Sequence, residues 1–166
     1  MEKLFKKAVV AVFAVIAMGV VAYAQQATDL AVGANVAFGF GDNYNNVGIA
    51  AKAQSTIFDN IRLEPSITYF FEKDNLSMYD YCLNVHYLIN VGDYITVYPL
   101  AGIDILNIQE NFGYHGTSSH SDLGFIVGGG IDFRITYDVA FNVEAKYRFG
   151  DDVNRTLLSA GISYMF

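Results

Sequence analysis

The sequence predicts an all-β fold: an eight-stranded, antiparallel, up-and-down transmembrane β-barrel preceded by a cleaved signal peptide. Three observations predict it. Apolar and polar residues alternate with a period of two in almost every segment after Asp29, which is the period of a β-strand. Tight turns alternate with longer polar loops along the chain. One face of each predicted strand carries no charge, whereas the opposite face carries many charged residues.

The first 24 residues have the layout of a secretory signal peptide. Three lysines form a basic start, residues 8–21 are an uninterrupted apolar run, and AYA at residues 22–24 is a small-x-small cleavage pattern. The run is short for a membrane helix of about 20 residues. We therefore expect residues 1–24 to be removed and residues 25–166 to form the barrel domain.

The body of the chain divides into eight segments, each about as long as a membrane-crossing strand of roughly 9–11 tilted residues, or slightly longer. They are residues 29–41, 47–58, 61–71, 76–89, 94–107, 122–135, 139–149 and 156–166. Short turns rich in Asx and glycine, FDN, NVGD and TYD, follow the second, fourth and sixth segments. Longer loops follow the odd segments, the longest being QENFGYHGTSSHS at 109–121. Short connections on one side and long ones on the other are typical of an outer-membrane barrel. Pro65 and Pro99 each remove a ladder donor, so we expect bulges there.

The uncharged faces are expected to meet lipid, because a charge there costs roughly 2–4 kcal/mol near the midplane. A soluble barrel also alternates, but the bulky apolar residues would overfill the narrow lumen of eight strands. Charges inside the barrel must be paired, because an uncompensated buried charge costs about 3–5 kcal/mol. We therefore expect a plug of linked ion pairs that closes the lumen to solutes. Its predicted members are Arg62, Glu64, Asp104, Asp132, Glu144, Lys146 and Arg148.

The glycines of GGG at 128–130 have a predicted role in this plug. A hairpin centred on Tyr137 places Gly130 opposite Glu144 and Gly128 opposite Lys146. The glycines would then leave space for the long charged side chains of the next strand. The loops are expected to form an acidic rim that is either solvated or shares divalent cations with lipopolysaccharide phosphates. Its predicted members are Asp42, Asp74, Glu110, Asp122, Asp151 and Asp152, with Lys73 and Arg155.

Three stretches carry a family resemblance: YPLAGIDI, GGGIDFRITYDVAFNVEAKYRF and the closing LLSAGISYMF. They resemble the small outer-membrane β-barrel proteins of Gram-negative bacteria, the superfamily of OmpA membrane domains, OmpX/Ail-type proteins and opacity-type porins. The resemblance implies a bacterial outer membrane, contact with its lipids and lipopolysaccharide, and insertion by periplasmic chaperones and the barrel-assembly machinery. An even strand number places both termini in the periplasm. The last stretch resembles the family's insertion signal, whose residues here are Leu158, Ile162, Tyr164 and Phe166.

The chain is acidic, with a net charge of -7 and no basic stripe, which argues against nucleic acid as a partner. We expect a non-enzymatic surface barrel that supports envelope integrity or surface interaction, with at most a narrow pore and no cofactor or metal. The alternative is a lipid-modifying enzyme of the deacylase or phospholipase type. It would use side chains of the longest loop: His115, His120, Ser118, Ser119 and Ser121. Such a catalytic set is recognised by its geometry, and a hydrophilic surface loop is the simpler interpretation.

Overall fold

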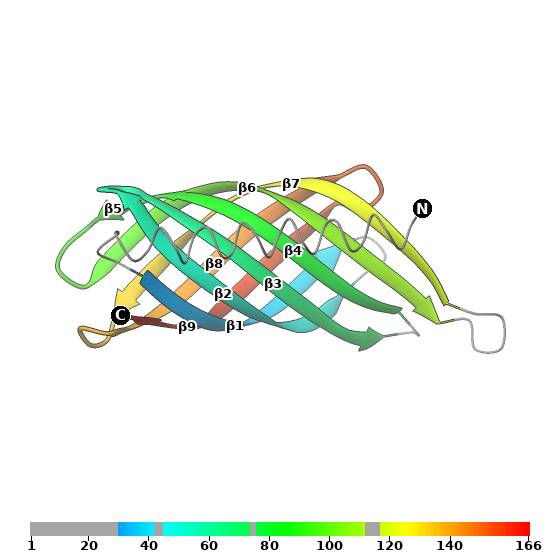
Figure 1. Cartoon of the computed structure of the whole chain (residues 1–166), viewed down its shortest axis with the longest axis horizontal. Helices are drawn as coiled ribbons and strands as arrows, with labels where there is room; N and C mark the ends of the chain where they lie inside the picture. Colours follow the sequence, from blue (N-terminus) through cyan, green and yellow to red (C-terminus); the bar gives the residue numbers. More distant parts are fainter. Residues whose placement is uncertain (1–29, 42–44, 74–75, 112–116) are drawn as a thin grey trace.

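The computed structural model describes residues 30–41, 45–73, 76–111 and 117–166, which form a closed antiparallel barrel (Figure 1). None of these residues belongs to a helix long and apolar enough to cross a membrane. The strands are β1 (Leu30–Gly41), β2 (Asn46–Phe58), β3 (Ile61–Lys73), β4 (Leu76–Tyr87), β5 (Ile89–Asn90), β6 (Ile95–Asn111), β7 (Thr117–Arg134), β8 (Val139–Gly150) and β9 (Arg155–Met165).

The barrel has eight strand positions around its circumference, here called walls, which confirms the predicted fold class. Neighbouring strands pair in the order β4-β3-β2-β1-β9-β8-β7-β6, and β4 pairs with β6 to complete the ring. The two-residue β5 continues the line of β4 along β6, so the two together form one wall. The seam between β1 and β9 runs from Ala31 opposite Met165 to Gly41 opposite Arg155. The predicted signal peptide, residues 1–24, lies outside the described residues.

The two ends of the barrel differ. The turn end holds the short connections after β2, β5 and β7 together with Phe166 (Figure 1). The loop end holds the connections after β1, β3, β6 and β8. The prediction of a loop over residues 109–121 is wrong for much of its length, because β6 and β7 stay paired from Leu106 opposite Asp122 to Asn111 opposite Thr117. The segment is polar on both faces, so the apolar alternation that reveals the other strands is missing there.

The two prolines do not produce the predicted bulges. Register shifts lie instead between Thr56 and Phe58, and between Phe70 and Lys73. At Pro99 the ladder between β6 and its neighbour stops after Leu100 and resumes at Val97 in the same register. Because Pro99 has no backbone N–H, strand pairing is interrupted beside it, but no residue is added to either strand and no bulge forms.

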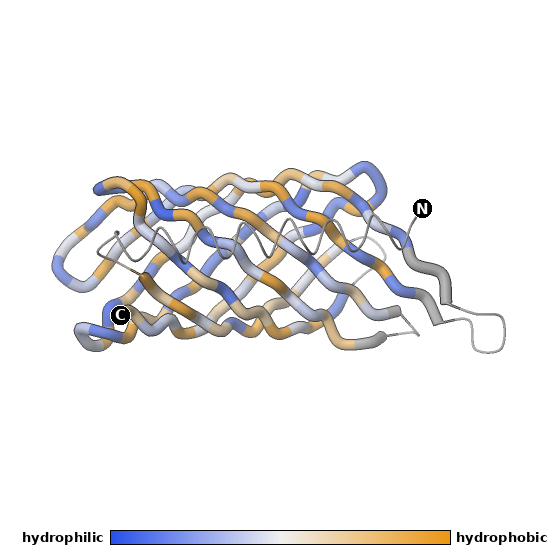
Figure 2. Tube along the Cα trace, viewed as in Figure 1, coloured by the Kyte–Doolittle hydropathy of each residue, from blue (hydrophilic) through white to orange (hydrophobic). Residues whose placement is uncertain are grey.

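Hydropathy alternates along every wall (Figure 2). The large exposed side chains are apolar residues of the outward register, including Val36, Ile49, Ile103 and Val127. Aromatic rings contact one another near both ends: Tyr69 with Tyr79 and Tyr147 with Phe149 at the loop end, and Tyr164 with Phe166 at the turn end. Such a band between two aromatic girdles is the expected surface of a membrane barrel.

Candidate functional site

The candidate site is the interior of the barrel, which polar and charged side chains fill. Strand alternation turns every second residue inward, and side chains from all walls meet across a lumen that eight strands leave barely wide enough to fill. The charged side chains form three groups. We call them the turn-end pair (Arg62 and Asp132), the central network (Lys52, Glu64, Glu144 and Lys146) and the loop-end network (Asp80, Asp104, Asp122, Arg148 and Arg155).

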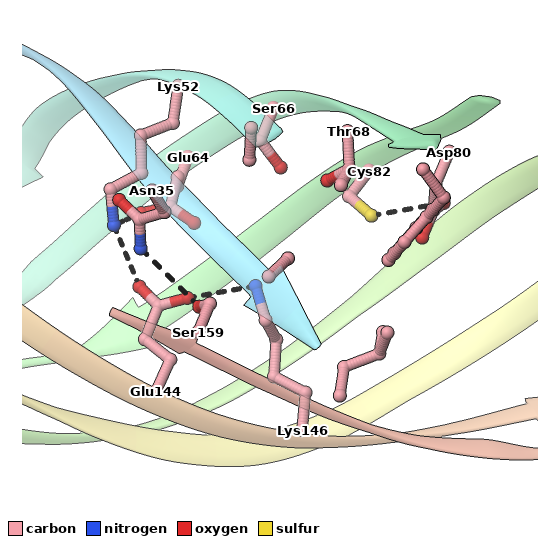
Figure 3. Close-up of a pocket in the computed structure, with 14 residues that line it drawn as sticks. Asn35, Lys52, Glu64, Ser66, Thr68, Asp80, Cys82, Glu144, Lys146 and Ser159 are labelled. Carbon is pink, nitrogen blue, oxygen red and sulfur yellow. Dashed lines mark hydrogen bonds and ion pairs between the residues drawn. The ribbon is translucent and has the colours of Figure 1, made fainter. Parts of the chain in front are cut away.

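The central network joins β2, β3 and β8 across the lumen (Figure 3). The Nζ atom of Lys52 lies 2.9 Å from Oε1 of Glu144 and 3.3 Å from Oε2 of Glu64. Glu144 also accepts from Lys146 Nζ at 2.8 Å and from the Tyr98 hydroxyl at 3.0 Å. All four charged side chains are at least 88% buried. Two ammonium groups and two carboxylates neutralise one another, as buried charges require.

Neutral polar side chains complete the central network. Gln54 donates to Oε2 of Glu64 at 2.7 Å, and Asn142 accepts from Lys52 at 3.0 Å. Asn142 also accepts from Asn35 at 2.7 Å. These bonds fix the carboxylates and the Lys52 ammonium in place, so the network has little freedom to rearrange.

The turn-end pair connects to the centre through His86. Arg62 Nη1 lies 2.6 Å from Asp132 Oδ2, and Arg62 Nε lies 3.1 Å from His86 Nδ1. Because a guanidinium only donates, Nδ1 must accept, and a neutral imidazole then carries its proton on Nε2. The His86 ring stacks on Tyr98 at 4.6 Å, and the Arg62 guanidinium lies 4.5 Å above the same Tyr98 ring.

The loop-end network is built around two buried arginines. Arg148 donates from Nε to Asp104 at 2.5 Å, from Nη1 to Asp122 at 2.8 Å and from Nη1 to the carbonyl of Val153 at 2.6 Å. Arg155 pairs with Asp80 at 3.3 Å, and its guanidinium lies 4.3 Å above the Phe70 ring.

An apolar cluster lies beside this network at the loop end. It consists of Ala37, Phe70, Met78, Leu106, Ile108, Val153 and Leu157, each at most 7% exposed. We call it the loop-end cap. Its members come from β1, β3, β4, β6, β9 and the β8–β9 connection. A dry apolar layer of this kind is a barrier to water and ions because neither finds hydrogen-bond partners in it.

One small cavity lies between the central network and the loop-end cap. Its free volume is about 20 Å³, which is room for about one water molecule. Lys146, Asp80, Cys82, Ser66 and Thr68 are among the residues that line it (Figure 3).

Glu64, His86 and Glu144 bring three potential metal ligands within 4.8 Å of one another. Their surroundings do not fit a divalent cation. Lys52 already supplies the positive charge between the two carboxylates, and the nitrogen of His86 that faces Glu64 at 3.7 Å carries the imidazole proton. The group therefore holds a lysine of its own chain where a metal would sit.

The predicted register of the GGG segment is confirmed: Gly128 lies opposite Lys146 and Gly130 opposite Glu144. The physical reason differs from the predicted one at Gly130, where an added Cβ would lie 2.6 Å from the Tyr98 ring. At Gly128 the obstacle is the backbone of β8, 2.2 Å away. Glycines that give space to charged side chains include Gly124, whose added Cβ would lie 2.8 Å from the Arg148 guanidinium carbon, and Gly150, whose added Cβ would meet Arg148 and Asp122.

The structure distributes the seven predicted plug residues over three groups rather than one centre. Glu64, Glu144 and Lys146 meet in the central network, Asp104 and Arg148 meet in the loop-end network, and Arg62 meets Asp132. The assignment of Asp122 and Arg155 to a solvated rim is wrong, because they are 4% and 1% exposed. Asp122 is already an inward position of the predicted segment 122–135, and continuing the inward alternation of the last segment by one step, from Leu157, reaches Arg155.

The histidine and serine residues of the alternative enzyme are only partly described. His120 Nε2 lies 2.6 Å from Asp152 Oδ2, with both side chains about 60% exposed. Ser121 faces the opposite side of β7 and donates to Asn107 at 2.7 Å. His115 and the side chains of Ser118 and Ser119 lie outside the described residues. The described geometry thus pairs the histidine with an acid but not with Ser121.

The four predicted insertion-signal residues all lie on the outward face of β9 or directly after it. Leu158, Ile162, Tyr164 and Phe166 are 43%, 56%, 47% and 72% exposed. The inward residues between them include Ser159 and Ser163, which are buried.

Comparisons with known proteins agree with this architecture. The chain is similar to the N-terminal β-barrel domain of Pseudomonas aeruginosa OprF, with 15% identity over 84% of this chain and 98% of that one, at a TM-score of 0.70. It is also similar to Neisserial surface protein A, with 16% identity over 83% and 96% of the two chains and a TM-score of 0.67. A third similar structure is the attachment invasion locus protein Ail of Yersinia pestis, with 18% identity over 83% of this chain and 97% of that one, at a TM-score of 0.58.

The sequence itself matches no curated protein significantly. It does match the family model described as "Outer membrane protein beta-barrel domain" over residues 8–166. This match spans nearly the whole chain, and the closed barrel with an apolar outer surface is the fold that the family name describes. The chain therefore belongs to the outer membrane β-barrel domain family of bacterial outer-membrane proteins.

Proposed function

We propose that this protein is a non-enzymatic integral barrel of the outer membrane whose sealed lumen makes it a poor pore. Its role is then mechanical or adhesive: it supports the integrity of the envelope or presents its loop end to a surface ligand. The observation that carries the proposal is the filling of the lumen by buried charges that form ion pairs across it.

Two further features support a seal. The turn-end pair and the central network cross the lumen from different walls, so a solute would have to break several short ion pairs in sequence. The loop-end cap then offers a permeating ion no polar partner. A path along the barrel axis meets both kinds of barrier.

Planar-bilayer recording of the purified wild-type protein tests the proposal. We expect no stable conductance beyond the leak of the membrane, and a measurable conductance from Glu144→Ala, which removes the acceptor shared by Lys52 and Lys146. A large, stable and solute-permeable conductance from the wild type would refute the sealed lumen.

The proposal extends to biogenesis and orientation. Residues 1–24 would be cleaved during export, both termini would face the periplasm, and the outward aromatic residues of β9 would be recognised by the barrel-assembly machinery after passage with periplasmic chaperones. Lipopolysaccharide and phospholipid would contact the outward face. N-terminal sequencing of protein from outer membranes tests the first point, with Gln25 as the expected first residue.

The alternative function is lipid modification, and the His120–Asp152 pair is the observation in its favour. A histidine held by a carboxylate is two-thirds of a hydrolase triad. Mass spectrometry of lipid A and phospholipids from cells with and without the protein separates the two functions. A changed lipid profile that His120→Ala abolishes would establish the enzyme.

A further inference from the structure

The loop-end network contains more acid than base. Within the described residues it brings together three carboxyl groups, those of Asp80, Asp104 and Asp122, and two guanidinium groups, those of Arg148 and Arg155. All five side chains are at least 96% buried. By contrast, the central network and the turn-end pair are each balanced. If every group were ionised, the loop-end network would hold one uncompensated negative charge away from water, which is strongly unfavourable.

The surplus charge can be located from the hydrogen bonds. Asp122 Oδ2 accepts from Arg148 Nη1 and from the backbone N–H of Val153, and Asp104 Oδ2 accepts from Arg148 Nε. The other oxygen of Asp104, Oδ1, is buried and has no hydrogen-bond donor. A buried carboxylate oxygen without a donor is costly and calls for an unseen partner.

Asp80 lies near Asp104 on the neighbouring strand. Cys82 stands directly opposite Asp104 in the β4–β6 ladder, so Asp80 is its diagonal neighbour on the same inward face. Diagonal neighbours of this kind lie about 7–8 Å apart, which brings the two carboxyl groups close to each other. From the described residues, Asp80 receives a 3.3 Å contact from Arg155 and a 3.4 Å contact from the Cys82 thiol, which is a weak donor. Two carboxylates cannot hydrogen-bond to each other unless one of them carries a proton.

We infer that Asp80 and Asp104 together bind one proton and function as a single acid pair. The proton forms an O–H···O bond between the two carboxyl groups, supplies the missing donor to Asp104 and reduces the charge of the network to zero. Paired carboxylates that share one proton are a known arrangement wherever two such groups are forced together out of water. This inference concerns the charge state of the lumen and is independent of whether the barrel conducts.

The other charged groups around the pair are consistent with this assignment. Arg148 and Asp122 face it from β8 and β7, Arg155 from β9, and Lys146 and Cys82 line the adjoining cavity. The Lys146 ammonium already forms an ion pair with Glu144 at 2.8 Å. No described cation is therefore left to take the place of the proton. The cavity beside Asp80 has room for a small ion, and the experiment must separate that source of charge from a proton.

Infrared spectroscopy of the folded protein at neutral pH tests the proposal, in a detergent without ester groups. A protonated carboxyl group gives a carbonyl band that shifts in deuterium oxide and with carbon-13 labelling of aspartate. We expect one such band in the wild type and its loss in both Asp80→Asn and Asp104→Asn. The matched control is Asp132→Asn, the same change in the turn-end pair, which should leave the band unchanged.

Stability supplies a second measurement. A single asparagine at either position supplies an N–H donor to the remaining carboxylate and keeps the network neutral, so each single variant should retain the melting temperature of the wild type. The double variant leaves the two arginines with Asp122 alone and should lose much of its thermal stability. Absence of the band in the wild type, or its survival in both single variants, would overturn the inference. So would a wild-type melting temperature that falls when sodium is replaced by choline, because a small cation would then supply the charge.

Discussion

The ammonium group of Lys52 on β2 lies 2.9 Å from Oε1 of Glu144 on β8, two strands that share no backbone hydrogen bonds. The ion pair therefore braces walls of the barrel that the sheet itself does not join directly. Glu144 is the acceptor on which the central network depends, since Lys146 and Tyr98 also donate to it.

Glu144→Ala should be strongly destabilising. The change leaves Lys52 with Glu64 and strands Lys146, whose ammonium has no other acceptor among the described ion pairs. We expect a loss of about 3–5 kcal/mol in the free energy of unfolding, measured by urea titration in detergent micelles, because a buried charge loses its partner. Asp152→Ala is the control, since the exposed pair with His120 is worth about 0–1 kcal/mol. Equal effects of the two changes would contradict the assignment of the central network.

Gly130→Ala should destabilise the barrel more than Gly129→Ala. A Cβ at Gly130 would lie 2.6 Å from the Tyr98 ring, which His86 stacks on and over which the Arg62 guanidinium lies. We expect a cost of about 1–3 kcal/mol, as for other overpacked interiors. A Cβ at Gly129 points to lipid and meets nothing closer than 3.1 Å. The unfolding midpoints of the two variants in urea give the comparison, and a larger loss at Gly129 would contradict the proposed packing.

The barrel could be predicted from the sequence because the constraint that shapes it acts on each strand separately and repeats at every second residue. Lipid forbids charge on one register of every strand, so the strands and the side of each that faces lipid follow from alternation. The position of the turn at Tyr137 then gives the Gly128–Lys146 register. The prediction was wrong where that constraint ends. Beyond Leu106 the paired residues of β6 and β7 are polar except for Ile108, which is buried in the loop-end cap, so this stretch resembles a loop.

The grouping of charges inside the lumen could not be obtained in the same way. Alternation shows that Arg148 and Glu144 both point inward, but their partners depend on height along the barrel and on which walls face each other. Arg155 illustrates the difficulty: it pairs with Asp80, 75 residues away in the chain, and it lies at the first position of β9, where a strand boundary read from sequence is least certain.

Leu106→Ala tests the loop-end cap. Leu106 is completely buried in the cap, and truncation of a buried leucine typically costs about 2–5 kcal/mol because a cavity remains. Ile103→Ala, on the lipid side of the same strand, is 49% exposed and should cost less, because lipid fills the space that the side chain leaves. Urea unfolding measures both. If the cap is also a barrier, Leu106→Ala should raise ion leakage in planar bilayers and Ile103→Ala should not.

Replacement of Tyr164 and Phe166 by serine should impair insertion rather than packing. The two rings contact each other at 5.1 Å and are 47% and 72% exposed on the outward side of the last strand, so the lumen loses nothing when they are removed. We expect the double variant to accumulate in the periplasm and to be degraded, with a large loss of outer-membrane protein in fractionated cells. The folded form is recognised by its heat-modifiable mobility on gels.

Phe58→Ser is the matched control, because Phe58 is 71% exposed at the same end of the barrel but lies in β2. If the aromatic residues act only as membrane anchors, Phe58→Ser and a single Phe166→Ser should reduce outer-membrane levels equally. A loss confined to the β9 variants would show that the insertion machinery reads the last strand, and unaltered levels of the double variant would refute it.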